Sequence, residues 1–216
     1  MDYALLRNSL LFKNMDDSEI KSCLRMFKAC ERSFGKDEII MTAGEPADYL
    51  GLVISGNVII ERNDLWGNRT EIKRVDTLRL IADAFAIGHE TMLFDVRAEN
   101  DCRILLLQTE DLNALAKQHA KWTVKFITNL LQIISIDNME LSVEAFHTSP
   151  KIMRERILSY LNTVALRKHK REFDIPLNRQ QMADYLHVDR SALSGELSLM
   201  QKEGLIKYRM NHFILL

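Results

Sequence analysis

The chain has 216 residues, of which 47% are hydrophobic and 27% charged, and its formal net charge is −1. This length accommodates one large or two ordinary globular domains, each with its own core. Apolar runs stay below the roughly 18 residues of a membrane span, and the N-terminus MDYALLRNSL lacks the layout of a secretory signal, so we expect a cytoplasmic protein with no membrane partner.

The three cysteines and the distribution of charge further narrow the classes of protein to which the chain can belong. An odd number of cysteines without a close pair argues against a disulfide framework. Residues 147–216 contain 12 Lys and Arg against 7 Asp and Glu, a net charge of +5, which leaves residues 1–146 with 17 against 23, or −6. A basic C-terminal module beside an acidic remainder is expected when one domain meets phosphates and the other does not.

The N-terminal half predicts short helices followed by a β domain. Residues 1–28 favour short helices, with Ser18 as a predicted N-terminal cap. Short β-type runs separated by glycines then indicate a small β-barrel or β-roll. The predicted strands are 38–41, 49–54, 57–62, 70–75 and 102–107, and the predicted hairpin tip is 64–68.

Residues 111–146 contain neither Gly nor Pro and predict a long helix. Apolar side chains at three-, four- and seven-residue spacings form a narrow seam of coiled-coil type, so we expect a homodimer. Packing on the chain's own β domain through Trp122 and Phe126 is the alternative, and both can hold on different faces. Asp137 and Asn138 interrupt the seam with polar groups that help to fix its register. The predicted interface consists of Ile127, Leu130 or Leu131, Ile134 and Leu141.

The segment from His147 to Pro150 is the predicted boundary, because a proline disfavours helix in the residue before it. A further amphipathic helix with Ile152, Ile157 and Leu161 follows it. Residues 178–206 then predict a helix-turn-helix. Asn178 can cap its first helix, over 179–186, and Gln181 can reciprocate as in a capping box.

The second helix of this motif is predicted over residues 190–203. Asp189 is placed to cap it and suits the positive end of the helix dipole, and Gly204 is placed to end it. Two β-rich runs within residues 207–216 then predict a hairpin wing.

Spacing separates the two faces of the second helix. Leu193, Leu197 and Met200 recur at i, i+4 and i+7 and should pack on the first helix. The opposite face carries small polar groups and one guanidinium, which suits the major groove of DNA, where Arg matches guanine O6 and N7. A solvated face of an ordinary helical hairpin is the alternative, which the predicted wing weakens. The predicted DNA contacts are Arg190, Ser191, Ser194, Gly195, Ser198, Arg179 and Gln180.

The basic run Arg167–Arg171 lies beside this motif in sequence. Such a run is usually only solvated, and contact with DNA phosphates is the functional alternative.

This order of elements resembles the Crp/Fnr family of bacterial transcription regulators, through GKDEIIMTAGEPADYLGLVISGNVII and LNRQQMADYLHVDRSALSGELSLMQKEGLI. The resemblance implies an α+β fold with an N-terminal β-roll of the cyclic-nucleotide-binding type, a long dimerisation helix and a winged helix-turn-helix. We expect these parts at 1–110, 111–146 and 147–216. The family also implies a homodimer on two-fold symmetric double-stranded DNA, an effector in the sensor, and RNA polymerase as a further partner.

The resemblance also implies where a cyclic nucleotide would bind. Members of that kind hold the phosphate with a Gly-Glu pair and an Arg-Ser or Arg-Thr pair, and this chain offers Ala82-Asp83 and Met92-Leu93 instead. A buried phosphate without a positive partner is costly, so we do not expect cyclic AMP. A small apolar or weakly polar effector, or no ligand, remains. The predicted pocket consists of Ile81, Ala82, Asp83, Phe85, Met92 and Phe94.

Other sensing chemistries lack ligands. An iron–sulfur cluster needs about four thiolates, whereas the chain has Cys23, Cys30 and Cys102, of which Cys102 is predicted in a strand core. Cys23 and Cys30 are predicted on one helical face, as packed thiols or a redox pair. His89 is a conceivable haem ligand, but a lone histidine is usually neither a ligand nor a switch, so we do not expect haem.

Two rival functions stand beside a specific regulator. An enzyme is disfavoured because the sequence has no Gly-rich phosphate loop, HExxH or G-x-S-x-G motif. A degenerate member that dimerises and binds a small ligand but binds DNA weakly is the other alternative. It gains support from Gly195, since the family commonly places a second Arg there.

Overall fold

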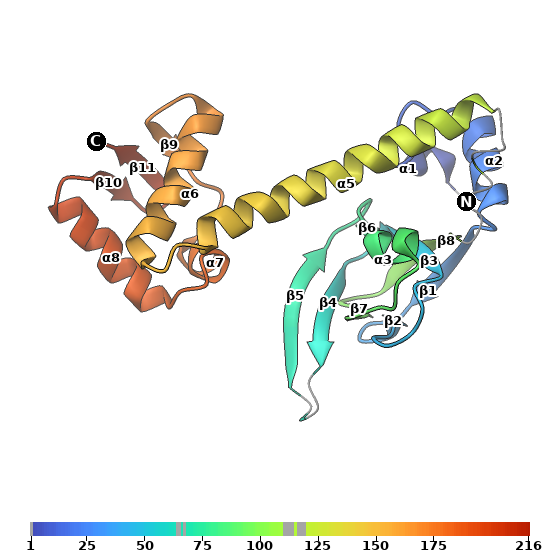
Figure 1. Cartoon of the computed structure of the whole chain (residues 1–216), viewed down its shortest axis with the longest axis horizontal. Helices are drawn as coiled ribbons and strands as arrows, with labels where there is room; N and C mark the ends of the chain where they lie inside the picture. The colour runs from blue at the N-terminus through green and yellow to red at the C-terminus, as the bar shows by residue number, and fades with distance from the viewer. Residues whose placement is uncertain (1, 64–65, 67, 110–114, 116–119) are drawn as a thin grey trace. The chain divides into compact units, whose positions relative to one another are not determined.

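The computed structural model describes residues 2–63, 66, 68–109, 115 and 120–216. The chain divides into two compact units, Met1–Ser135 and Ile136–Leu216, each with its own hydrophobic core (Figure 1). The predicted boundaries after residues 110 and 146 stay predictions. No helix in the described part of the chain combines the length and the apolar character needed to cross a membrane.

The first unit begins with α1 (Tyr3–Arg7) and α2 (Asp17–Met26). Asp16, not the predicted Ser18, caps α2: its Oδ1 accepts the N–H groups of Ser18 and Glu19 at 2.9 Å each. The prediction was wrong because a carboxylate two residues earlier accepts both bonds and also suits the positive helix end.

The prediction that Cys23 and Cys30 share a helical face was also wrong. Cys23 is buried in α2, which ends at Met26, and Cys30 opens the first strand.

Eight strands among the described residues of this unit form two antiparallel four-stranded sheets. The strands are β1 (Cys30–Phe34), β2 (Ile39–Met41), β3 (Tyr49–Ser55), β4 (Val58–Asn63), β5 (Arg69–Val75), β6 (Leu80–Ile81), β7 (Asp95–Ala98) and β8 (Cys102–Gln108). Their orders are β1-β8-β3-β6 and β2-β7-β4-β5. This arrangement confirms the predicted β-roll, although β1, β6 and β7 were not predicted.

The centre of the roll depends on a close approach between β3 and β6. Gly51 pairs with Ile81, and a Cβ on Gly51 would lie 2.5 Å from Cγ1 of Ile81, so only glycine fits without displacement. The short helix α3 (Asp83–Gly88) follows β6. Strands β4 and β5 pair as a long hairpin, from Val58 opposite Val75 to Asn63 opposite Arg69 (Figure 1), while most of the predicted tip at 64–68 lies outside the described residues.

Helix α5 (Lys121–Thr148) begins in the first unit and ends in the second. The predicted start of the long helix, at residue 111, lies outside the described residues. Trp122 and Phe126 are buried in the core of the first unit, as the alternative packing predicted. Phe126 packs on Phe27 with ring centroids 4.9 Å apart.

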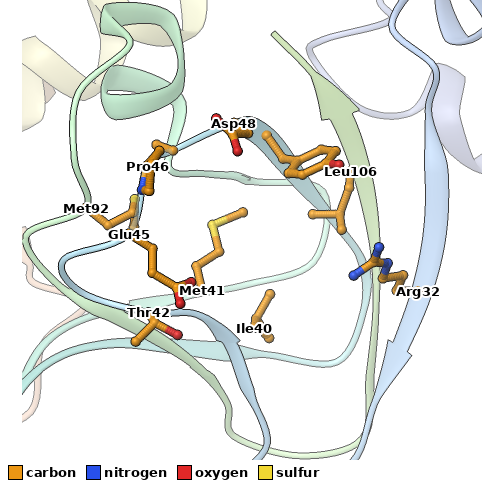
Figure 2. A pocket seen from close by; sticks show the side chains of 11 residues that line it. Arg32, Ile40, Met41, Thr42, Glu45, Pro46, Asp48, Met92 and Leu106 are labelled. Atoms are coloured by element: carbon orange, nitrogen blue, oxygen red, sulfur yellow. The ribbon is translucent and has the colours of Figure 1, made fainter. Parts of the chain in front are cut away.

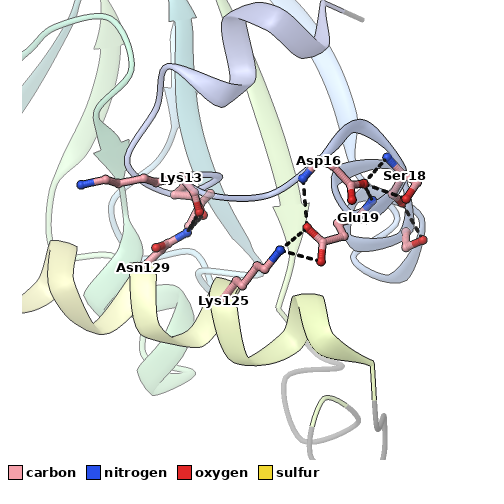
Figure 3. A network of polar contacts seen from close by, with 8 residues as sticks. Lys13, Asp16, Ser18, Glu19, Lys125 and Asn129 are labelled. Carbon is pink, nitrogen blue, oxygen red and sulfur yellow. Dashed lines mark hydrogen bonds and ion pairs between the residues drawn. The ribbon is translucent and has the colours of Figure 1, made fainter.

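Polar contacts tie the same helix to the N-terminal segment (Figure 3). Asn129 donates to the backbone carbonyls of Leu11 and Lys13 at 3.0 and 2.8 Å. The Lys125 ammonium contacts both carboxylate oxygens of Glu19, at 2.8 and 2.6 Å. Because a buried amide without partners is costly, these bonds fix which face of α5 meets its own unit.

The second unit is a winged helix-turn-helix. Its elements are the end of α5, α6 (Met153–Lys168), β9 (Glu172–Asp174), α7 (Arg179–Tyr185), α8 (Arg190–Lys202), β10 (Ile206–Arg209) and β11 (His212–Leu215). The strands form one antiparallel sheet in the order β10-β11-β9, so the predicted wing is confirmed and β9 extends it. Ile157 and Leu161 are buried as predicted, whereas Ile152 precedes α6 and is exposed.

Candidate DNA-reading surface and sensor cavity

Local capping bonds position α7 and α8. Gln181 N–H donates to Asn178 Oδ1 and Asn178 N–H donates to Gln181 Oε1, both at 2.9 Å, which confirms the predicted capping box. Asp189 Oδ1 accepts the N–H of Ala192 at 2.8 Å at the start of α8. Gly204, with φ of +80°, follows the end of α8 in the left-handed conformation that favours glycine.

The two faces of α8 are separated as the spacing predicted. Leu193, Leu197 and Met200 are fully buried in the core of the second unit. The opposite face is open to solvent, apart from half-buried Ser194. We call it the DNA-reading face; it consists of Arg190, Ser191, Ser194, Gly195 and Ser198.

Hydrogen bonds limit what the serines of this face can offer. Ser194 Oγ donates to the carbonyl of Arg190 at 3.0 Å, and Ser198 Oγ donates to the carbonyl of Ser194 at 2.9 Å. A hydroxyl has one proton, so Ser194 in this state offers only acceptor capacity outward. Ser198 Oγ also lies 3.2 Å from the Tyr208 hydroxyl, which takes up part of its remaining acceptor capacity. Arg190 is exposed and makes no side-chain hydrogen bond or ion pair within the described residues, so its donors are available.

Arg179, a predicted DNA contact that stays a prediction, is held by contacts within the second unit. Its guanidinium lies 5.2 Å from the ring centroid of Tyr208 and 5.9 Å from that of Phe213. It also donates to the carbonyl of Met210 at 3.2 Å, and burial lowers its pKa. The side chain therefore joins α7 to the wing, a cation–π role that sequence spacing does not reveal. Gln180 remains exposed and bonds Asp184 at 2.7 Å.

Two arginines of α6 support the motif and were not predicted. Arg154 contacts Glu196 and Glu203 at 2.6 Å each, bracing α8 on its sides away from the DNA-reading face. Arg156 donates to the carbonyls of Pro150 and Leu186 at 2.6 and 3.1 Å. Arg156 thereby satisfies a carbonyl at the end of α7, a position where cations are favoured.

The first unit contains a cavity of about 200 Å³ (Figure 2). Strands β1, β2 and β8 and the segment between β2 and β3 supply most of its lining, with Arg32, Glu45 and Asp48 as charged groups. Its apolar lining includes Ile40, Met41, Met92 and Leu106. The volume is below the roughly 300–1,000 Å³ typical of pockets for drug-sized ligands, so it suits a smaller molecule.

Of the predicted pocket residues, only Met92 lines this cavity. Phe85 and Phe94 instead pack edge to face with ring centroids 6.2 Å apart, and Ile81 is buried against β3. Ala82 has a left-handed φ of 59° before α3, where Asp83 begins the helix. The predicted pocket followed family alignment and stays a prediction, whereas the lining of this cavity comes largely from residues 40–49, which tertiary folding brings together.

Arg97 does not replace the missing phosphate ligand. Its guanidinium makes hydrogen bonds of 3.0–3.2 Å to the buried carboxylate of Glu61 and also pairs with Asp37. These carboxylates raise the pKa of Arg97, with the hydrogen bond to Glu61 as the main cause.

The sulfur ligands are similarly dispersed. Cys102 lies buried in β8, as predicted, and burial raises the pKa of both its thiol and the Cys23 thiol. Within the described residues, no group of three or more His, Cys, Asp or Glu is arranged to hold a metal ion.

On α5 the structure distinguishes two adjacent leucines that spacing left as alternatives. Leu130 is 8% exposed and belongs to the core of the first unit, so it is removed from the predicted dimer interface. Leu131 is 60% exposed, and Ile127 and Leu141 are exposed as well. Ile134 is half-buried at the edge of the same core.

Both units match models of known protein families. Residues 31–119 match the cyclic nucleotide-binding domain, and residues 155–216 match the Crp-like helix-turn-helix domain. A curated relative, the transcriptional activator protein FnrL of Cereibacter sphaeroides, is 24% identical over 201 residues, covering 88% of this chain and 77% of FnrL.

Solved structures show the same fold. The c-di-GMP responsive regulator CLP of Xanthomonas campestris has a TM-score of 0.55 at 18% identity, covering 93% of this chain and 99% of CLP. The catabolite activator protein of Thermus thermophilus has a TM-score of 0.50 at 20% identity, covering 96% and 94%. At such identities these likenesses support the fold only.

The fold and the two matched domains define a regulator that joins a domain of the cyclic-nucleotide-binding type to a winged helix-turn-helix. The chain belongs to the Crp/Fnr family of transcription regulators.

Proposed function

We propose that this regulator acts as a homodimer that binds a two-fold symmetric operator through α8 and responds to a small effector other than cyclic AMP. The exposed DNA-reading face of α8, opposite its fully buried stripe, is the observation that carries the proposal. An α-helix fits the major groove and presents its first turns to the base edges. The net charge of +5 over residues 147–216 favours approach to phosphates.

The hydrogen bonds of the DNA-reading face determine which contacts with bases it can make. Arg190, near the start of α8, is the proposed bidentate contact to guanine. Ser194 would accept from a base amino group while it donates to its own helix, and Ser198 would do so beside its contact with the Tyr208 hydroxyl. With Gly195 in place of a second guanidinium, specificity rests on Arg190, Ser191 and the two serines, and the operator contact is narrower than is common in the family.

The proposed dimer seam is an exposed stripe on α5. Val124, Ile127 and Leu131 are exposed, and Leu141 continues the stripe after half-buried Ile134. Successive spacings of three and four residues place Asn138 in this seam. An Asn at one core position of a coiled coil fixes register and a two-stranded state at some cost in stability, which favours a specific dimer over a general apolar patch.

The proposed effector is small. A cavity of about 200 Å³ with Met92 where a phosphate-binding Arg would be needed does not suit a cyclic nucleotide. Arg97 offers no substitute because Glu61 and Asp37 already hold it. RNA polymerase is a further proposed partner, on the strength of the family alone.

Titrating the full chain against genomic DNA fragments at two salt concentrations tests this function. A specific operator gives discrete shifted fragments with affinity well above the background, and binding weakens steeply with salt because each neutralised phosphate releases a counterion. Salt-sensitive binding that is equal for all fragments would refute the specific regulator and favour the degenerate member.

A further inference from the structure

The last turn of α5 carries His147, a side chain that is only 2% exposed. It lies within the second unit, where its ring meets α6 and α7. Its Nδ1 is 2.8 Å from the hydroxyl of Tyr185 on α7, and its Nε2 is 2.8 Å from Oγ1 of Thr163 on α6. The ring also packs edge-on against Tyr160, with centroids 5.6 Å apart. One imidazole therefore joins three helices.

Neighbouring bonds determine the tautomer of this imidazole. Thr163 Oγ1 lies 3.0 Å from the carbonyl of Ser159, which can only accept, so the threonine proton is used there. The same oxygen must then accept from His147, which places the ring proton on Nε2. Nδ1 is left to accept from the Tyr185 hydroxyl. The result is a directional chain from Tyr185 through His147 and Thr163 to the Ser159 carbonyl.

We propose that neutral His147 is a positioning residue that holds α7, the first helix of the helix-turn-helix, on the end of α5, and that protonating it weakens specific DNA binding. The proposal rests on the DNA-binding function proposed above. An imidazolium has two donors and no acceptor, so the Tyr185 hydroxyl could no longer donate to Nδ1. The three-helix joint would lose its bond to α7 and contain a buried charge.

The surroundings set the pH range of this effect. Burial, followed by the positive charge of Arg167 on α6, lowers the pKa of His147 from its ordinary 6.5. Burial also raises the pKa of Tyr185, and that of Tyr160 to about 12, so both phenols stay neutral. The hydrogen bonds of this joint are therefore complete above about pH 6.5. Their contribution to holding α7 on the end of α5 is lost as the pH falls through the lowered pKa of His147.

Two further ionisable groups lie near the joint and need a control. Glu144 of α5 carries a negative charge towards Tyr185, and its Oε1 lies 3.9 Å from Nε2 of His187, which follows α7. The side chain of His187 is exposed. Protonating it would strengthen its pairing with Glu144, the opposite sign to the effect at His147. His187→Gln is therefore a matched control.

The tautomer is tested by nitrogen-15 spectra of the histidine-labelled full chain between pH 5 and 8. We expect His147 to be neutral with its proton on Nε2 at pH 7 and to titrate below 6.5. Tyr185→Phe removes the donor to the neutral ring and should raise the midpoint. Tyr160→Phe removes a phenol that only packs on the ring and should not. A proton on Nδ1, a charged ring at pH 7, or equal shifts in both variants would overturn the proposal.

The functional consequence is tested with a duplex selected from a random pool by the wild-type chain. Between pH 7.5 and 5.5 the affinity of the wild type for this duplex should fall at least about fivefold more than that of His147→Gln. Fivefold is the low end of the usual coupling between two sites. His187→Gln should show the same fall in affinity as the wild type. Should His147→Gln fold poorly, Tyr185→Phe serves instead. It lacks the bond from α7 to Nδ1 at every pH, so its affinity should already be lower at pH 7.5 and should fall less than that of the wild type between pH 7.5 and 5.5.

The two proposals can fail separately. If no duplex is selected, the DNA-binding function is wrong, while the spectra still decide whether the joint exists. If a duplex is selected and the wild type and His147→Gln show the same pH dependence, the proposed role of His147 is wrong.

Discussion

Replacing each of two adjacent leucines of α5 with alanine separates core packing from subunit pairing. Leu130 is 8% exposed and packs in the core of the first unit. Leu130→Ala should lower the free energy of unfolding by about 2–5 kcal/mol, the usual cost of such a core truncation. For a chain of this length that corresponds to a fall in Tm of roughly 4–20 °C.

Leu131→Ala should instead weaken the dimer. The side chain is 60% exposed in the single chain, so its truncation should change monomer stability by no more than about 0.5 kcal/mol. Full burial of a leucine is worth about 1.5–3 kcal/mol. Scaling this free energy by the exposed 60% and counting the two copies of Leu131 gives about 2–4 kcal/mol of dimer stability. Loss of this contribution should raise the dimer Kd roughly 30- to 700-fold.

Sedimentation equilibrium measures the dimer Kd, and denaturant unfolding at two protein concentrations separates monomer stability from pairing. The assigned faces of α5 are wrong if Leu131→Ala leaves the Kd unchanged. They are also wrong if Leu130→Ala weakens the dimer without destabilising the fold.

Two further substitutions test the DNA-reading face, and a third tests the buried ion pair of the first unit. Arg190→Ala should cost about 1–3 kcal/mol on a selected duplex and relax preference at one base pair, whereas equal loss on all duplexes would make it a phosphate contact. Gly195→Arg should tighten DNA binding in gel-shift titrations, since a Cβ there meets no atom within 4 Å; unchanged affinity counts against this placement of α8. Arg97→Ala should lower unfolding free energy by about 3–5 kcal/mol by leaving buried Glu61 unpaired, and Arg97→Met with Glu61→Gln should restore most of it.

The helix-turn-helix could be predicted from the sequence because its determinants are local. The caps of α7 and α8 act within three residues, and the buried stripe of α8 follows directly from helical periodicity. The wing was predictable for a related reason, since its two strands adjoin in sequence. The packing of Arg179 could not be predicted because its partners Tyr208 and Phe213 lie about thirty residues further on, where only folding brings them together.

The missed strands are too polar or too short for a strand pattern to stand out. β1 reads Cys-Glu-Arg-Ser-Phe, with three polar residues in a row, and β7 alternates polar and apolar residues over only four positions, Asp-Val-Arg-Ala, two of which carry charged groups. In β7 these groups are satisfied by distant partners: Arg97 binds Glu61, and Asp95 accepts the N–H of Ala43 at 2.7 Å. Leu130 and Leu131 could not be separated by spacing, because adjacent helix positions lie within the width of one seam.

The central claim is tested most directly by selecting duplexes from a random pool with the wild-type chain and sequencing those retained. The account predicts enrichment of an inverted repeat whose half-sites are centred about one helical turn apart, roughly 10 base pairs, or a multiple of it. Enrichment of a single unrepeated half-site, or no enrichment over the starting pool, would contradict a dimer that reads DNA through α8.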